Sequence, residues 1–411
     1  MSLAAQVSAG FTAVGNEINT LRHPLTTRTL GYSNGGIGGQ NTSYATGAST
    51  QITLTNASFR LPFRMPTTLQ WRLKLRNYDS LASATKTALT LDGIAMGTMT
   101  AQATGAVAQT GTFASATTIA TGGATIPGDG TFYATPWITT PATQFQQGQD
   151  QMISVGFHAP SALAMQTGIG QCWYWSDSAS ALNSSIAGSA ATNAASWIPL
   201  DWVLEYQVSN RRRAFLIVGD SISEGTTGPA YALSGSATAA AATALWRGQW
   251  DRWGARRGIM VQKLCLYASP ASTWANANYT GWTRQTTTGP YDGAVLALGA
   301  NDIKGGQTFA QLQASYISCL TNLRNIVGPG VPLYGVNVMA ESMTGTAETY
   351  RLQFNNWLSS IPAPLTDVID VESEMRSTAT NVLDTQLTCD TVHPSYEGQA
   401  KLADIFLAAI P

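Results

Sequence analysis

Apolar and polar residues alternate repeatedly between about residue 51 and residue 210. The clearest case runs from Leu69 to Leu75, where each apolar residue is followed by a polar or charged one. This spacing is typical of a strand with one buried and one solvated face. The same alternation recurs at 153–157 and at 202–208, and Gly-rich turns separate the runs. We therefore expect an antiparallel β-sandwich of jelly-roll type over 51–210.

A different pattern begins at about residue 211. Continuous apolar runs, as expected of parallel strands covered on both faces, lie at 215–218, 261–266, 294–298, 333–339 and 368–371. Segments with helical periodicity separate them, at 239–257, 309–326, 347–359 and 398–409. We predict a three-layer α/β domain with a parallel sheet over 211–411. Functional groups of such domains lie at the carboxyl ends of the strands.

The N-terminal residues carry a third pattern. Apolar positions from Ala4 to Leu21 are spaced three and four apart, as in a short coiled coil. As a coiled coil, a helix over 1–24 would be stable only with partner chains, for instance in a homotrimer. An ordinary amphipathic helix packed on its own domain explains the pattern equally well. Residues 25–50 are rich in Gly, Ser and Thr, a composition typical of a linker or an extended arm.

Charge and composition exclude several functions. Only 11 % of the residues are charged and the net charge is −1, so the basic surface that nucleic acids require is missing. The histidines His23, His158 and His393 are too far apart for a spacing-based metal motif, and we expect no metal. No stretch has the ~20 apolar residues of a membrane span. The N-terminus does not resemble a secretory signal either, which favours an intracellular protein or one released by lysis.

Three short polar motifs follow predicted strands or precede the last predicted helix. Gly-Asp-Ser-Ile contains Ser221, Gly-Ala-Asn-Asp contains Asn301, and Asp-Thr-Val-His runs from Asp390 to His393. A serine at a strand end presents its hydroxyl and its N–H to a ligand, and an asparagine amide can donate to a developing oxyanion. A carboxylate three residues before an imidazole can orient that imidazole while it deprotonates a serine. His393 is the only histidine after residue 211, so it is the only candidate base of this kind there.

In order and spacing these motifs resemble the SGNH hydrolases, also called GDSL esterases, over residues 212–411. The resemblance implies a flavodoxin-like fold with Ser221 as nucleophile, His393 as general base and then acid, and Asp390 as the orienting carboxylate. It further implies an oxyanion hole lined by the Ser221 N–H and the Asn301 amide, and a mechanism without cofactor. It also implies structural roles for Asp220 and Asp302.

The sequence departs from the family pattern after the second predicted strand of this domain. The family has a glycine there, whose N–H completes the oxyanion hole, whereas this chain reads LCLYASPASTWAN. We expect Ser269 to supply that N–H, because Pro270 has none.

The resemblance implies a serine esterase, and we expect it to remove short acyl groups, such as acetyl, from a bacterial surface polysaccharide. Two alternatives stay open: a receptor-binding or structural tail protein with a degenerate esterase domain, and a lipase or thioesterase for longer acyl chains. A coiled-coil start, an arm, a sandwich and a terminal esterase together resemble the layout of phage tail-associated proteins. That layout implies a location on the virion, or outside the cell after lysis.

Overall fold

A computed structural model of the chain describes residues 28–32, 52–63, 65–79, 84–99, 113–165, 173–176, 191–192, 200–208, 212–225, 248–266, 268–284, 291–377, 381–388 and 390–411. The helix predicted over 1–24 lies outside these residues and stays a prediction. Of the predicted arm, the structure describes one strand. In the described residues, no helix combines the length and the apolar character needed to cross a bilayer.

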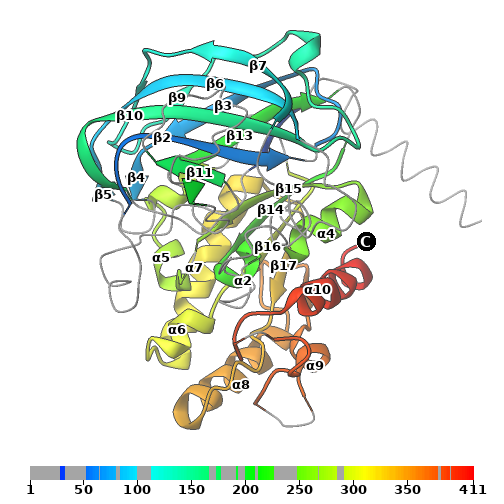
Figure 1. The fold of residues 1–411 in the computed structure, drawn as a ribbon. Coiled ribbons are helices and arrows are strands. Elements are labelled where there is room, and N and C mark those ends of the chain that lie inside the picture. The colour runs from blue at the N-terminus through cyan, green and yellow to red at the C-terminus, as the bar shows by residue number, and fades with distance from the viewer. Residues whose placement is uncertain are drawn as a thin grey trace, which may run out of the picture.

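Two antiparallel sheets form the N-terminal region (Figure 1), which confirms the predicted β-sandwich. The smaller has the order β1-β13-β3-β9, with strands β1 (Arg28–Tyr32), β13 (Asp201–Val208), β3 (Gln70–Arg76) and β9 (Tyr133–Ala134). The larger has the order β12-β11-β2-β10-β6-β7, with β8 beside β6. Its strands are β2 (Ile52–Phe63), β6 (Leu89–Met99), β7 (Phe113–Thr121), β8 (Thr125–Ile126), β10 (Gln151–Met165), β11 (Trp173–Ser176) and β12 (Ala191–Thr192). A ribbon of β4 (Tyr78–Asp79) and β5 (Ala84–Thr85) stands apart from both sheets.

The sandwich core lies between the two sheets. Phe63 of β2 contacts Trp202 of β13 edge to face, with 5.5 Å between ring centroids. Our expectation of one solvated face is wrong for β13, because Glu205 on its other face is only 2 % exposed. The reason is charge pairing: the Glu205 carboxylate accepts from Arg72 at 2.6 Å and from Lys74 at 3.4 Å. Burial of a carboxylate is tolerated when such partners satisfy it.

The C-terminal domain contains a parallel sheet of five strands in the order β15-β14-β16-β17-β18. The strands are β14 (Ala214–Gly219), β15 (Met260–Cys265), β16 (Gly293–Ala297), β17 (Leu333–Val336) and β18 (Asp367–Ile369). The first strand lies between the second and the third, which is the flavodoxin-like order. All five strands coincide with predicted apolar runs, so the predicted α/β fold is confirmed.

Helices cover both faces of this sheet (Figure 1). One face packs against α4 (Gln249–Arg257) and α10 (Tyr396–Ala409). The other packs against α5 (Ala271–Trp274), α7 (Phe309–Val327) and α8 (Gly345–Ser359). Shorter elements are α2 (Ser221–Glu224), α6 (Ala300–Lys304), α9 (Glu372–Met375) and the 3-10 turns η2 (Pro141–Thr143) and η3 (Thr280–Arg284). Thr308 is the N-cap of helix α7 and forms a capping box with Gln311.

A buried charge cluster joins the two domains. The Asp201 carboxylate of β13 accepts from Arg76 Nε of β3 at 2.7 Å and from Arg284 Nε of η3 at 2.9 Å. All three side chains are fully buried. One continuous apolar cluster also spans the sandwich and one face of the parallel sheet. The sandwich therefore packs directly on the domain that carries the motifs.

Candidate active site

Ser221 is the first residue of helix α2 and is separated from the end of strand β14 by Asp220 alone. Asp220 caps this helix, with its carboxylate accepting from the Ile222 N–H at 3.0 Å. Gly219 is required here because a Cβ would overlap the Ser223 side chain. Glycine is thus needed at this turn because the Ser223 side chain packs closely against its Cα, and not because the backbone is left-handed. It places the Ser221 hydroxyl at the carboxyl edge of the sheet.

The structure brings Ser221, His393 and Asp390 together, although His393 follows Ser221 by 172 residues. Ser221 Oγ lies 3.0 Å from His393 Nε2. His393 Nδ1 in turn lies 2.7 Å from Asp390 Oδ2. The serine is 6 % exposed. This chain of contacts lets the imidazole accept the serine proton while the carboxylate holds its other nitrogen.

The loop before α10 holds Asp390 in place. Its Oδ1 atom accepts from the backbone N–H of His393 at 2.6 Å and of Val392 at 3.1 Å. Burial alone would raise the pKa of Asp390, but these bonds and the nearby His393 imidazole bring that pKa below its usual value. Asp390 is therefore ionised and positioned to stabilise a protonated imidazole.

Asn301 lies on α6 at the same edge of the sheet. The preceding turn needs Gly299, whose φ of 131° is unfavourable for other residues. Asn301 Nδ2 donates to Asp220 Oδ2 at 3.1 Å and to the Ser269 carbonyl at 3.4 Å. The amide thus lies between the serine turn and the loop after β15.

Our expectation for Ser269 is not met by the structure. Its N–H donates to the Leu266 carbonyl at 3.2 Å, and the residue is fully buried. Ala268, one residue earlier, is exposed and adopts a left-handed φ of 55°. Its N–H has no acceptor within the described part of the chain. Unlike the Ser269 N–H, the Ala268 N–H is therefore available to bond a ligand.

Further carboxylates surround the motifs. Asp302 accepts from the Ala271 and Ser272 N–H groups at 2.6 and 3.1 Å, and so fixes the start of α5. Burial, followed by the charge of Glu341, raises the pKa of Asp220 to about 7. Sequence reasoning did not identify Glu341, because a single glutamate in a loop carries no motif. In the described residues, no group of three or more His, Cys, Asp or Glu side chains is arranged to hold a metal ion.

Comparison with known proteins gives a family match over the C-terminal domain. Residues 217–401 match the GDSL-like Lipase/Acylhydrolase family. No curated protein matches the chain.

Several solved structures are similar at low identity. A lipolytic protein of the G-D-S-L family from Veillonella parvula is 16 % identical, covering 48 % of this chain and 98 % of its own, with a TM-score of 0.38. A family two carbohydrate esterase from Cellvibrio japonicus is 10 % identical, covering 94 % of this chain and 91 % of its own, with a TM-score of 0.37. A salicylyl-acyltransferase from a tetracycline biosynthetic pathway is 12 % identical, covering 91 % of this chain and 89 % of its own, with a TM-score of 0.36.

These TM-scores are below 0.5, so the assignment rests on the family match and on the parallel sheet with its motifs. Both concern the same part of the chain, from β14 to α10. The family match supports a carboxylic ester hydrolase in the C-terminal region of this chain, similar to the GDSL, or SGNH, hydrolases.

Proposed function

We propose that this domain cleaves esters through a covalent acyl-enzyme on Ser221. The observation that carries the proposal is the 3.0 Å contact between Ser221 Oγ and His393 Nε2, continued at 2.7 Å from His393 Nδ1 to Asp390. A nucleophile, a base and an orienting carboxylate within hydrogen-bond reach are the arrangement that serine acyl transfer requires.

Each step of this reaction has a group to perform it. Ser221 Oγ attacks the ester carbonyl carbon, its proton passes to His393 Nε2, and the carbonyl electron pair moves onto oxygen. Asp390 holds the proton on Nδ1, which leaves Nε2 free to accept, and then stabilises the imidazolium. When the bond to the alcohol breaks, the imidazolium protonates the leaving oxygen. Water, deprotonated by the same imidazole, then releases the acid and regenerates the serine.

The oxyanion has three proposed donors. They are the N–H groups of Ser221 and Ala268, neither of which has an acceptor in the described part of the chain, and the amide of Asn301. Both hydrogens of that amide are engaged, so one bond must open for the substrate. Donors aimed at developing charge are a major source of catalysis in such sites.

The proposed substrate is a short acyl ester, such as an acetyl ester, of a bacterial surface polysaccharide. The polar groups that gather around Ser221, from Asp220, Asn301, Glu341 and His393, suit a compact acyl group on a polar alcohol better than a long apolar chain. We place this substrate on a bacterial surface because the domain layout resembles that of phage tail-associated proteins.

An assay with p-nitrophenyl acetate tests the catalytic proposal. We expect the wild type to hydrolyse it and Ser221→Ala to fall to the uncatalysed rate. Equal rates for the two proteins would refute the mechanism and favour a degenerate domain in a binding or structural protein.

A chain-length series tests the substrate proposal. We expect kcat/KM to fall from acetyl to octanoyl esters, and acetate to be released from acetylated polysaccharides. A preference for octanoyl esters would instead indicate a lipase or thioesterase.

A further inference from the structure

Ser269 is a fully buried serine that the proposed mechanism does not use. It lies in the loop between β15 and α5, one residue after Ala268, whose N–H is a proposed oxyanion donor. The Ser269 N–H donates to the Leu266 carbonyl at 3.2 Å, which is the bond that closes a four-residue turn. Ala268 is the third residue of this turn, where turns of type II require a positive φ such as its 55°. The closing bond does not use the Ala268 N–H, which stays available to a ligand.

The Ser269 hydroxyl bonds this turn to two neighbouring elements. Trp274 Nε1 of α5 donates to Ser269 Oγ at 3.0 Å. Ser269 Oγ in turn donates to the Gly219 carbonyl over 3.4 Å, at the end of β14 and two residues before Ser221. The Leu266 N–H donates to the same carbonyl at 3.1 Å. The turn after β15 is thereby attached to the segment that carries the nucleophile.

The Ser269 carbonyl contacts another proposed donor. It accepts from Asn301 Nδ2 at 3.4 Å. Asn301 lies on α6, and the next residue of that helix, Asp302, accepts from the N–H groups of Ala271 and Ser272 at 2.6 and 3.1 Å. Helix α6 is thus bonded to the loop at Ser269 as well as to the first turn of α5. Ser269 therefore contacts or adjoins the elements of all three proposed oxyanion donors.

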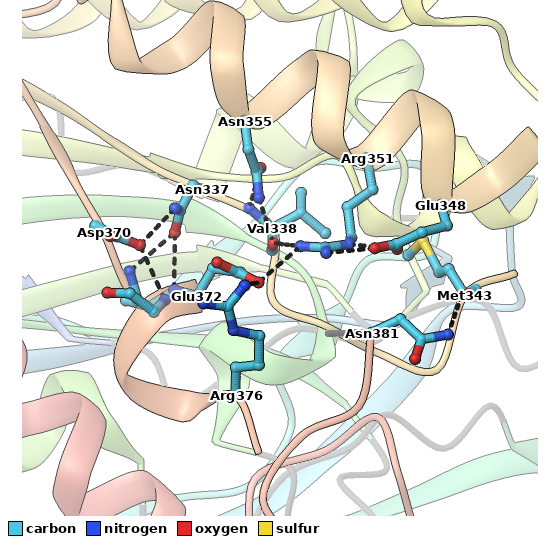
Figure 2. Close-up of polar contacts among 12 residues, drawn as sticks. Asn337, Val338, Met343, Glu348, Arg351, Asn355, Asp370, Glu372, Arg376 and Asn381 are labelled. Atoms are coloured by element: carbon cyan, nitrogen blue, oxygen red, sulfur yellow. Dashed lines mark hydrogen bonds and ion pairs between the residues drawn. The ribbon is translucent and has the colours of Figure 1, made fainter. Parts of the chain in front are cut away.

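A second network holds another loop at the same edge of the sheet (Figure 2). Arg351 of α8 is fully buried and donates to the Glu348 carboxylate at 2.7 Å and to the Val338 carbonyl at 3.1 Å. Asn355 bonds both the N–H and the carbonyl of Val338, at 2.9 and 2.8 Å. Like Ser269, Asn355 thus uses two hydrogen bonds of its side chain to hold other parts of the chain near a strand end. Among the residues that the structure describes, it forms no hydrogen bond with the proposed donors, so it provides a control for a purely structural role.

We propose that Ser269 is a positioning residue of the oxyanion hole, whose hydroxyl and carbonyl hold the Ala268 N–H and the Asn301 amide in place relative to the serine turn. The inference rests on the proposed function, because an oxyanion forms there only when Ser221 attacks an ester. Donors that are fixed before the reaction need no reorganisation when charge develops, so their alignment affects the rate. An alanine at position 269 would keep both backbone bonds and lose both bonds of the hydroxyl.

Steady-state kinetics of Ser269→Ala with p-nitrophenyl acetate test this inference. We expect kcat to fall about tenfold, less than the loss of about 10² to 10³ for a whole donor, because the Ala268 N–H is displaced and not removed. KM should stay within about twofold, because acylation and deacylation both pass through an oxyanion. The control Asn355→Ala should lower the midpoint of urea denaturation and leave kcat within about twofold of the wild type.

Inhibition by trifluoroacetone separates a positioning role from a general loosening of the fold. Ser221 Oγ adds to the carbonyl carbon of this ketone, the serine proton passes to His393, and the carbonyl electron pair moves onto oxygen. The adduct carries an oxyanion and is not turned over. In Ser269→Ala we expect the inhibition constant to rise by the factor by which kcat falls, about tenfold. In Asn355→Ala it should not change.

A second variant tests the same hydroxyl. Trp274→Phe keeps an aromatic side chain and removes the N–H that Ser269 Oγ accepts. Its kcat should fall about threefold, and it decides if Ser269→Ala does not fold, in which case an unchanged kcat overturns the inference. In a folded Ser269→Ala, a loss of kcat below about threefold or an unchanged inhibition constant overturns it. An inactive wild type would instead refute the proposed function.

Discussion

Asn301 Nδ2 donates to the Ser269 carbonyl over 3.4 Å, a longer contact than its 3.1 Å bond to Asp220. The longer contact is the weaker, because such bonds usually measure about 2.9–3.0 Å. We expect the oxyanion of the tetrahedral intermediate to replace it. In Asn301→Ala, kcat should therefore fall by about 10² to 10³ with little change in KM. Steady-state kinetics on p-nitrophenyl acetate measure both constants.

The control for this variant is Asn356→Ala, which truncates an exposed asparagine on α8. Its kinetic constants should equal those of the wild type. A loss of less than about threefold in Asn301→Ala would show that its amide is not an oxyanion donor.

Ala268 adopts a φ of 55°, a conformation that costs a residue with a Cβ about 1–2 kcal/mol. Ala268→Gly removes this cost and keeps the N–H. We expect the free energy of unfolding to rise by about 0.5–1 kcal/mol and kcat to stay within about twofold. Urea denaturation and the acetate assay measure the two effects.

An alanine-to-glycine substitution inside a helix has the opposite effect on the free energy of unfolding, and it serves as the control. Ala314 is exposed within α7. Ala314→Gly should lower the free energy of unfolding by about 1 kcal/mol. If Ala268→Gly destabilises the protein to the same extent, the left-handed conformation at Ala268 is not a source of strain.

The parallel sheet could be predicted because burial on both faces leaves a continuous apolar run, as at 215–218. Helix α7 was predictable because Thr308 is a strong N-cap. The proposed role of the Ala268 N–H was not predictable, since the sequence does not show that the Ser269 N–H bonds Leu266. Nor was the place of Glu341 predictable, because its ion pair with Lys304 and its position in one cavity with Asp220 depend on how distant loops pack.

Asp390→Asn tests the orientation of the imidazole. An amide can donate to Nδ1, which favours the tautomer with a proton on Nε2, and that tautomer cannot accept from Ser221. We expect kcat to fall by about 10⁴. The double variant Ser221→Ala/Asp390→Asn should be no slower than Ser221→Ala, because the residues act as one unit. A loss below about tenfold in Asp390→Asn would argue against its proposed role.

Asp201→Asn tests the charge cluster between the domains. It leaves the buried guanidiniums of Arg76 and Arg284 without their shared carboxylate. Removing one partner from a buried ion pair costs about 3–5 kcal/mol of unfolding free energy. Asp404→Asn, in an exposed pair with Arg256, should cost less than about 1 kcal/mol. Urea denaturation measures the free energy of unfolding of both variants. Equal losses in the two variants would contradict a stabilising role for the cluster.

The free energy of unfolding of Asp220→Asn tests the raised pKa of the buried carboxyl beside Ser221. The folded pKa of Asp220 is about 7, whereas an unfolded Asp has a pKa of about 3.9. Between these values the folded state holds a proton that the unfolded state has lost, so this group lowers stability as pH rises. An asparagine does not titrate, and its side-chain oxygen can still accept from the Ile222 N–H.

Relative to the wild type, Asp220→Asn should therefore gain about 2 kcal/mol of unfolding free energy between pH 5 and pH 7. Urea denaturation at pH 5, 6 and 7 measures the difference between the two proteins at each pH. Other groups whose pKa is raised by burial, such as Glu341, contribute to both proteins and cancel to first order. A difference that stays constant with pH would mean that Asp220 is already ionised in the folded protein at pH 5. In that case the backbone N–H groups of Ile222 and Ser223 and the charge of Lys304 would outweigh burial and hold a negative charge beside the proposed oxyanion hole.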